Sequence, residues 1–506
     1  MRLSIWLMLF YWIPGGWCVG QDRNPNIVII LADDLGYGDP GCYNDESLIP
    51  TPNIDQLANQ GMRFLDAHTP SSVCTPTRYG LLTGRFCWRT QLKRGVLWPW
   101  DPPLLESERL TLPEMLQQQG YVTGCIGKWH LGWDWPLENG KYVTDEFQGF
   151  TLPANKRAAW ADRIDFSKPS RGGPNDHGFQ HYFGDDVPNF PPYAFIRDRQ
   201  TVRLPSVSKP AHYFGHPGPA TPAWDLSVVM PRITQEAVKF IDNRQADPDH
   251  PFFLLVTLTA PHTPIAPSPH FIGKSQAGWY GDYVNQVDWT VGQIQKALQR
   301  NQFSKETLLI FTSDNGSPQR NGVNMSGPIG SVKEFGHDPS RPWRGMKSDA
   351  WEGGHRVPFV AVWPDHIKAN ATSDEPIILT DLMRTVAGLV DFQLDENSAE
   401  DSFDIRPALF AKAGSKKGNP IHDHLVHHSG NGLFAIRQGP WKLILGKNSG
   451  GFTQYRPPAD APAGQLYNLE SDPAEKNNVY SQHPDLVLKL TRRLDEIKTA
   501  GRSHVQ

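Results

Sequence analysis

The stretch NIVIILADD, residues 26–34, predicts the centre of the fold. Its apolar, largely β-branched run is typical of a parallel strand that is buried on both faces. The run ends in Asp33 and Asp34, and ligands bind at the carboxyl ends of strands in open α/β sheets. Two adjacent carboxylates repel each other, so they need a cation or exposure to solvent. From this stretch alone, the two aspartates could form a metal site or lie in a solvated turn.

Strand patterns alternate with helix patterns over much of the chain. Strands are predicted at residues 121–126, 251–258, 307–313 and 359–363. Helices are predicted at residues 51–60, 111–119, 227–244, 281–300 and 380–389. This rhythm favours an α/β fold with a large, mostly parallel sheet flanked by helices.

The strand at residues 307–313 also ends in polar residues, Asp314 and Asn315. Together with Asp33 and Asp34 they form a set that carries only oxygen ligands. Such a set suits a hard cation, Ca²⁺ or Mg²⁺, better than zinc. We expect one cation at these strand ends.

The segment CTPTRYGLLTGR, residues 74–85, predicts an anion site beside a cysteine. Pro76 fixes its own φ and disfavours the helical region for Thr75, so we expect a helix to begin near Pro76. The free N–H groups of its first turn and the guanidinium of Arg78 would bind an anion next to Cys74. A lone cysteine can also be an inert buried side chain.

Two lysines and two histidines lie in loops that follow predicted strands or precede one. Lys128 and His130 are two residues apart and face the same way on an extended segment. His262 lies between two prolines, and Lys347 lies in a glycine-bounded loop. Lysines can hold anion oxygens and histidines can move protons, although each residue alone could be an ordinary lysine or histidine.

Taken in order, these motifs resemble those of the sulfatase family. The matching stretches are DDLGYGD (33–39), CTPTR (74–78), GKWHLG (127–132), APH (260–262), DNG (314–316), Lys347 with EGG (352–354), and LYNLESDP (466–473). The resemblance covers most of the chain after residue 20. It implies an alkaline phosphatase-like fold and a sulfuric ester hydrolase that acts on a sulfated carbohydrate or an aryl sulfate.

The resemblance also implies the cofactors. In this family a formylglycine-generating enzyme converts the motif cysteine to formylglycine, which would place the modified residue at Cys74. The hydrated aldehyde attacks sulfur through one hydroxyl and later breaks its own ester. The family's single Ca²⁺ would be held by Asp33, Asp34, Asp314 and Asn315.

The remaining motif residues receive catalytic roles from the same resemblance. The residues that would neutralise the sulfate oxygens are Arg78, Lys128 and Lys347. His262 would protonate the departing alcohol, and His130 would help to expel sulfate. A phosphate-ester hydrolase of the related alkaline phosphatase superfamily and a non-catalytic glycan-binding protein are the alternatives. A zinc pair would favour the phosphatase, but the ligand set lacks histidines for a second metal.

The ends of the chain predict how it is organised. Residues 1–20 have a positive start, a short apolar run and a small-residue cleavage site, which is typical of a secretory signal. We expect a catalytic domain over residues 21–380 and a smaller α+β domain with an antiparallel sheet over residues 381–506. No later stretch is long and apolar enough to span a membrane, and we expect an exported protein.

The composition and the middle of the chain bear on the substrate. A formal net charge of −4 makes nucleic acid a poor partner. Residues 133–225 are rich in proline, glycine and aromatic side chains and predict loops over the rim of the sheet. Tryptophans near the motifs can stack on sugar rings or pack the loops, and they are Trp98, Trp100, Trp133, Trp135 and Trp160. A histidine cluster (His422, His424, His427 and His428) lacks the pattern that would complete a zinc site.

Overall fold

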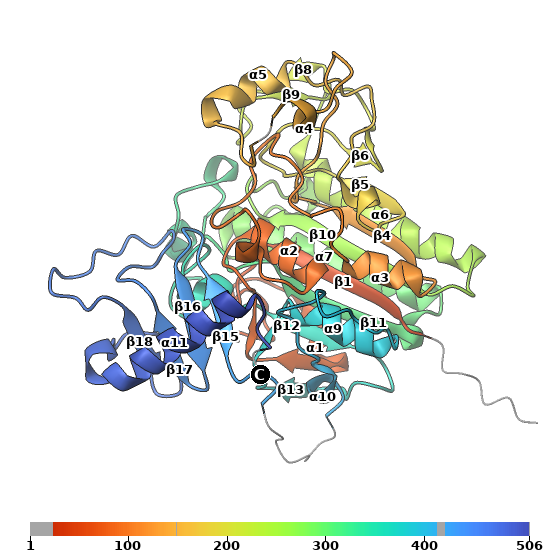
Figure 1. The fold of residues 1–506 in the computed structure, drawn as a ribbon. Coiled ribbons are helices and arrows are strands. Elements are labelled where there is room, and N and C mark those ends of the chain that lie inside the picture. The colour runs from red at the N-terminus through yellow and green to blue at the C-terminus, as the bar shows by residue number, and fades with distance from the viewer. Residues whose placement is uncertain (1–23, 148, 412–419, 505–506) are drawn as a thin grey trace, which may run out of the picture.

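The computed structural model describes residues 24–147, 149–411 and 420–504, and Figure 1 shows their arrangement. The predicted signal at residues 1–20 therefore lies outside the described residues. At the centre is a ten-stranded sheet. In spatial order its strands are β13 (Ala371–Ser373), β2 (Met62–Phe64), β12 (Phe359–Val362), β11 (Thr307–Ser313), β1 (Asn26–Asp33), β10 (Phe252–Pro261), β4 (Val122–Gly127), β5 (His181–Gly184), β6 (Ile196–Arg197) and β7 (Gln200–Thr201).

The five strands from β11 to β5 run parallel, and antiparallel strands flank them on both sides. β1 lies in the middle because its side chains are apolar on both faces. Alternate residues of β1 enter two separate hydrophobic cores, Ile27, Ile29 and Leu31 on one side and Val28, Ile30 and Ala32 on the other. The predicted fold class is confirmed.

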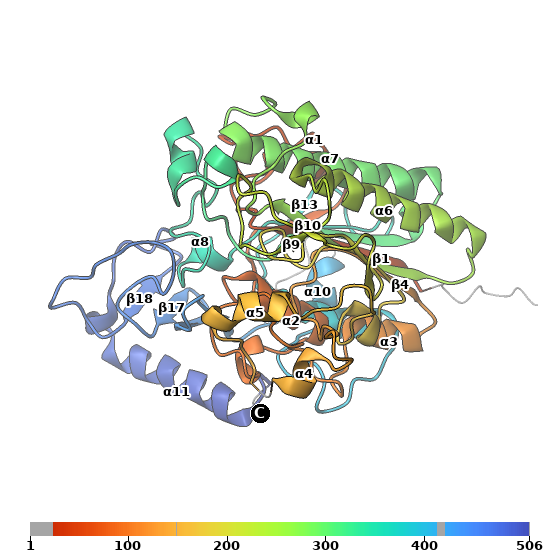
Figure 2. The same ribbon diagram turned by 90° about the horizontal axis from the view of Figure 1, so that it is seen from above.

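Helices cover both faces of this sheet, as Figure 2 shows. The helices on one face are α1 (Pro52–Gln60), α6 (Val229–Asn243) and α7 (Gly278–Arg300). Those on the other face are α2 (Cys74–Thr83), α3 (Leu112–Gln118) and α9 (Asp381–Leu389). The predicted starts of these helices lie close to the observed ones. α3 begins at a capping box in which Thr111 and Glu114 each accept a hydrogen bond from the other's backbone N–H.

The expected start of the helix near Pro76 is wrong by two residues. α2 begins at Cys74, and Val73 is its N-cap. Proline is tolerated in the first turn of a helix because the N–H that it lacks would have no intrahelical partner there. The restriction on the residue before a proline is a preference, and here burial of the whole helix overrides it. Cys74 is thus the first helical residue.

A second sheet forms the C-terminal part of the molecule (Figure 1). Its antiparallel strands are β15 (Leu425–His428), β16 (Phe434–Gln438), β17 (Trp441–Ile444) and β18 (Gln465–Asn468), and α11 (Pro484–Ala500) packs on them. β15 also contacts the segment just before Cys74. The carbonyl of His428 accepts from Ser72 N at 3.1 Å and from Ser71 Oγ at 2.9 Å.

Shorter elements complete the description. Those of the predicted loop region are α4 (Val143–Glu146), α5 (Arg157–Ala161), β8 (Val207–Ser208) and β9 (Pro219–Ala220), which Figure 1 shows above one end of the large sheet. Others are β3 (Ala67–His68), β14 (Ile377–Ile378), α8 (Glu352–His355) and α10 (Arg406–Leu409). Among the described helices, none is long and apolar enough to cross a membrane. The four cysteines of the described residues are unpaired.

Candidate active site

Four side chains with oxygen ligands meet where β1 and β11 end. The two strands are parallel neighbours, so the residues that follow them emerge side by side. Asp34 has a φ of 69°, and its backbone N–H donates to Asp314 Oδ1 at 3.2 Å. Asn315 Nδ2 donates to Asp34 Oδ1 at 2.7 Å. Asp33 completes the group, and all four residues are buried.

Each carboxylate of this group contacts a cation. The pairs are Lys128 Nζ with Asp33 Oδ2 at 2.7 Å, Arg78 Nη2 with Asp314 Oδ2 at 2.7 Å, and Lys347 Nζ with Asp34 Oδ1 at 2.5 Å. Burial works to raise the pKa of Asp34, but Lys347 and His262 outweigh it and the pKa is lowered. Burial raises the pKa of Asp314, and the neighbouring charge of Asp33 adds to the effect.

The acidic group fits a cation for a reason besides its composition. Asp33 Oδ1 and Asn315 Oδ1 are buried and accept no hydrogen bond from the described residues. Buried polar atoms are almost always satisfied, so two such oxygens in one acidic cluster indicate a missing positive partner. Ligand atoms of Asp33, Asp34 and His262 lie within 4.8 Å of one another. Carboxylate and amide oxygens suit a hard divalent cation.

Cys74 lies beside this cluster at the N-terminus of α2. Its Sγ and carboxylate oxygens of Asp33 and Asp314 lie within 4.8 Å of one another. Arg78 is one turn further along the same helix. Burial raises the pKa of the Cys74 thiol, although Lys128 and Lys347 oppose the rise. An unmodified Cys74 would therefore remain a thiol, which is a poor nucleophile.

His130 follows β4 and is held by two hydrogen bonds. It has a φ of 55°, which is uncommon for a residue other than glycine. Its backbone N–H donates to Asp186 Oδ1 at 3.2 Å, and its Nε2 lies 3.0 Å from the carbonyl of Leu97. Because a carbonyl only accepts, Nε2 carries the proton and Nδ1 has the free lone pair. Nδ1 is buried and has no partner among the described residues.

His262 follows β10 on the other side of the carboxylates. Its Nδ1 lies within hydrogen-bond distance of the Thr263 carbonyl, so Nδ1 carries the proton. Its Nε2 lies 3.9 Å from Asp34 Oδ2 and faces the cluster. Burial lowers the pKa of His262 well below its ordinary value, and Lys347 lowers it further. All ten residues that the sequence singled out thus lie in one site.

Asp185 and Asp186 were missed in the sequence. They follow β5, at the same edge of the sheet as Asp33 and Asp34. Asp186 Oδ1 accepts from the His130 backbone and from Trp133 Nε1, both at 3.2 Å, so it positions the His130 segment. An acidic pair directly after a strand was the available signal. The region was instead taken as loop because its strands are short.

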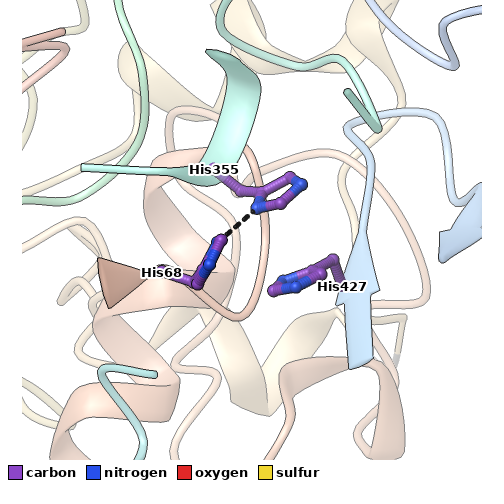
Figure 3. Close-up of side chains that lie close together, drawn as sticks. All are labelled: His68, His355 and His427. Carbon is purple, nitrogen blue, oxygen red and sulfur yellow. Dashed lines mark hydrogen bonds between the residues drawn. The ribbon is translucent and has the colours of Figure 1, made fainter. Parts of the chain in front are cut away.

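A second titratable cluster lies between the large sheet and the C-terminal sheet. His68, His355 and His427 are buried, and ligand atoms of the three lie within 4.8 Å of one another (Figure 3). The rings of His355 and His427 stack, with centroids 3.9 Å apart and planes at 14°. Nitrogen lone pairs lie in the ring plane, so stacked rings cannot both point at one ion. This geometry argues against a metal site.

Hydrogen bonds account for His68 and His355 without an ion, whereas His427 Nε2 is buried with no hydrogen-bond partner among the described residues. Lys442 has no acceptor, so its Nζ donates to His355 Nε2 at 3.0 Å. His355 Nδ1 then donates to His68 Nδ1 at 3.0 Å, and His68 Nε2 donates to Asp66 Oδ1 at 2.7 Å. Burial lowers the pKa of all three histidines, which keeps them neutral. His422, from the histidine-rich stretch in which no zinc pattern was complete, contacts Asp381.

The tryptophans near the motifs divide into two kinds. Trp98 keeps 38% of its surface exposed. The buried members of the set are Trp100, Trp133, Trp135 and Trp160. Four of the five therefore pack the loops onto the sheet, and Trp98 alone of this set is available to a ligand.

The fold and the site together define an α/β enzyme that handles an anionic ester. A family model described as Sulfatase matches residues 25–392. The N-acetylgalactosamine-6-O-sulfatase of Bacteroides thetaiotaomicron is 32% identical over 95% of this chain and 94% of its own length. Human arylsulfatase A is also 32% identical, over 96% of this chain and 90% of its own.

Solved structures agree with these relatives. A Bacteroides thetaiotaomicron protein, from work on the metabolism of multiple glycosaminoglycans, is 30% identical with a TM-score of 0.76 and covers 94% of this chain and 99% of that chain. A sulfatase from Pseudoalteromonas sp. is 25% identical with a TM-score of 0.70, and the match covers 96% of this chain and 92% of that chain. The chain belongs to the sulfatase family, and it is an enzyme that hydrolyses sulfate esters.

Proposed function

We propose that the enzyme removes sulfate from sulfated carbohydrates, with formylglycine formed from Cys74 and one Ca²⁺ in the site. The observation that carries the proposal is the convergence at the N-terminus of α2. There Cys74 meets three buried cations and two unsatisfied buried oxygens. The names of the relatives, which include N-acetylgalactosamine-6-sulfatases and arylsulfatases, support a sulfated sugar with aryl sulfates as accessory substrates.

Two groups would supply chemistry that unmodified side chains lack. A hydrated formylglycine at position 74 would offer a hydroxyl nucleophile and a way to release sulfate by breaking its own C–O bond. Ca²⁺ would act as a Lewis acid towards the sulfate group. The residues that would hold the cation are Asp33, Asp34, Asp314 and Asn315, whose oxygens suit it.

The cations would bind the three charged oxygens of the substrate. Arg78, Lys128 and Lys347 are buried, and each is held by a carboxylate before the substrate arrives. Donors fixed in a site without water stabilise developing charge without reorganising. This arrangement favours the transition state in which negative charge grows on the sulfate and on the departing oxygen.

The two histidines would move protons on opposite sides of the sulfate. His262, with Nε2 facing the carboxylates, would give a proton to the departing sugar oxygen. The low pKa of His262 means that it acquires this proton with the bound anion rather than in the free site. His130, whose Nδ1 is free, would take a proton from residue 74 when sulfate is expelled.

Mass spectrometry and a desulfation screen together test the proposal. The peptide with residue 74 should show formylglycine in active protein, and Cys42→Ala should leave both the modification and turnover intact. Cys74→Ala should remove turnover but keep the fold. Substrates would include 6-sulfated N-acetylgalactosamine, sulfated polysaccharides, nitrophenyl sulfate and, as the phosphatase control, nitrophenyl phosphate. Activity in protein that carries only unmodified Cys74, or preference for the phosphate, would contradict the proposal.

The same measurement addresses export. We propose that residues 1–20 direct the chain out of the cytoplasm. A formylglycine-generating enzyme would act on the chain during this maturation. The mass of protein recovered outside the cytoplasm should then correspond to a chain that begins near Gln21. A full-length chain retained in the cytoplasm would argue against export.

A further inference from the structure

An arginine and an exposed tryptophan form a pair at the rim of the active site. The guanidinium carbon of Arg157, at the start of α5, lies 5.0 Å from the ring centroid of Trp98. Trp98 stacks on Phe190 with centroids 5.3 Å apart and planes at 19°. His216 meets both rings edge to face, at 5.4 Å and 4.9 Å. The rings of Trp98, Phe190 and His216 thus form an aromatic platform. Phe190 is 5% exposed, so this platform rests on a buried side chain.

The platform joins the catalytic residues through two contacts. The ring of Phe190 meets the ring of His130 edge to face, with centroids 6.0 Å apart. Leu97, the residue before Trp98, accepts the hydrogen bond of His130 Nε2. A sugar whose sulfate lies near His130 would therefore place a neighbouring group beside Trp98.

Arg157 lacks the partner that an arginine normally has. Among the described residues, no carboxylate lies within ion-pair distance of its guanidinium, and its Nε is buried without a hydrogen-bond partner. Arg163 in the same segment provides the contrast, since it lies over Trp160 at 4.6 Å and also pairs with Glu146. Burial raises the pKa of Asp101 and the nearby charge of Arg157 opposes the rise, but the two groups form no ion pair. An arginine that is held by an aromatic ring and makes no ion pair is arranged for an anion from outside.

We propose that Arg157, oriented by Trp98, binds a second anionic group of the substrate, next to the sulfate that is removed. This inference rests on the proposed function and names the substrate class more narrowly, as a polyanionic glycan. The group is a carboxylate of a neighbouring uronic acid or a second sulfate. Both present the planar or trigonal set of oxygens that a guanidinium binds with two donors. No bond is made or broken at this subsite.

The test compares substrates with and without a second anion. The probes are a 6-sulfated chondroitin disaccharide, its carboxyl-reduced form, a disulfated disaccharide and nitrophenyl sulfate. Arg157→Ala should raise KM for the disaccharide that carries the carboxylate or the second sulfate by about ten- to 150-fold, the range for a charge-assisted hydrogen bond. KM for nitrophenyl sulfate and kcat should change little. The anion whose presence makes KM sensitive to Arg157→Ala, carboxylate or second sulfate, is the group that Arg157 binds.

Three further variants make the result specific. Arg163→Ala removes an arginine from the same segment, which already has an acidic partner, and should leave every KM unchanged. Arg157→Lys should recover part of the affinity, and Trp98→Ala should weaken the polyanionic substrates because Arg157 loses its support. An equal rise in KM for the carboxyl-reduced monosulfated disaccharide, or no rise for either second anion, overturns the proposal.

Failure of the subsite is distinguishable from failure of the proposed function. Calorimetric titration of the disaccharides into the Cys74→Ala protein measures binding without turnover, and Arg157→Ala in that background should weaken it by the same factor. If wild-type protein turns over nitrophenyl sulfate but Arg157→Ala binds the disaccharides equally well, only the subsite is wrong. If no sulfate ester is turned over, the proposed function fails and the titration still decides the subsite.

Discussion

At the scale of single residues, Asp185 shows how a buried acid depends on its surroundings. It follows β5 beside Asp186, and its Oδ1 is buried without a partner among the described residues. Burial raises the pKa of Asp185 to about 7, and the adjacent Asp186 adds to the rise, whereas Lys128 opposes it. In an unfolded chain an aspartate has a pKa of about 3.9.

A pH dependence of stability follows from this shift. Between pH ~4 and ~7 the folded protein holds a proton at Asp185 that the unfolded chain has lost, so stability from this group falls as the pH rises. Asp185→Asn removes the titration. Between pH 5 and pH 8 the wild type should lose about 2–3 kcal/mol more free energy of unfolding than the variant. Urea denaturation across this range is the measurement.

The exposed Asp45 provides the control for this comparison. Asp45→Asn should follow the wild-type dependence on pH, because this substitution leaves the buried Asp185 carboxyl in place. Parallel curves for wild type and Asp185→Asn would show that Asp185 is ionised in the folded protein throughout.

At the scale of the elements, strands were easier to predict than the residues that connect them. β11 was predicted with its observed bounds because its buried apolar run is unbroken. The beginning of α2 was missed because the prediction rested on the conformational preference of the residue before a proline. Burial of the whole helix outweighs that preference, and burial cannot be read from the sequence. The ten candidate site residues were singled out from motifs, and their catalytic roles stay a prediction. Strand ends alone predicted that the acids lie together, but not that the lysines, the histidines and Cys74 join them. The domain boundary at residue 380 stays a prediction.

The histidine cluster marks the limit of sequence analysis. His68, His355 and His427 come from three distant segments, so no local pattern announces them. Their contacts arise because β15 packs against the loop that leads to Cys74. The sequence instead directed attention to four histidines between residues 422 and 428, of which His427 alone belongs to this cluster. Tertiary packing, which cannot be read from spacing, decides such clusters.

The same packing leads to a prediction about β17. Lys442 Nζ contacts Glu352 Oε1 at 2.8 Å and Glu475 Oε1 at 2.9 Å, and all three side chains are fully buried. Lys442→Met leaves two buried acids facing each other, which should cost about 3–5 kcal/mol of stability. Urea denaturation measures the loss. Lys447→Met, at an exposed position of the same segment, should cost less than ~0.5 kcal/mol. Similar stability of the two variants would contradict the role of Lys442.

At the scale of the whole molecule, the candidate active site contains charged side chains from segments spread over most of the chain. Its three carboxylates lie at the ends of β1 and β11, and its three cations come from α2, the loop after β4 and the loop before α8. The formal charges of these groups cancel. A divalent cation alone would leave a buried excess of positive charge, and a sulfate dianion alone would leave a buried excess of negative charge. Together they restore the balance.

Cation and sulfate should therefore bind cooperatively. After chelation of the protein, Ca²⁺ titrated by calorimetry should bind about 5–150-fold more tightly in sodium sulfate than in sodium chloride of equal ionic strength, which corresponds to a coupling of about 1–3 kcal/mol. Sulfate affinity must rise by the same factor when Ca²⁺ is present. Lys347→Met removes one cation, so Ca²⁺ alone should bind it more tightly than wild type and gain less from sulfate. Equal Ca²⁺ affinity in both salts would show that the site does not balance its charges in this way.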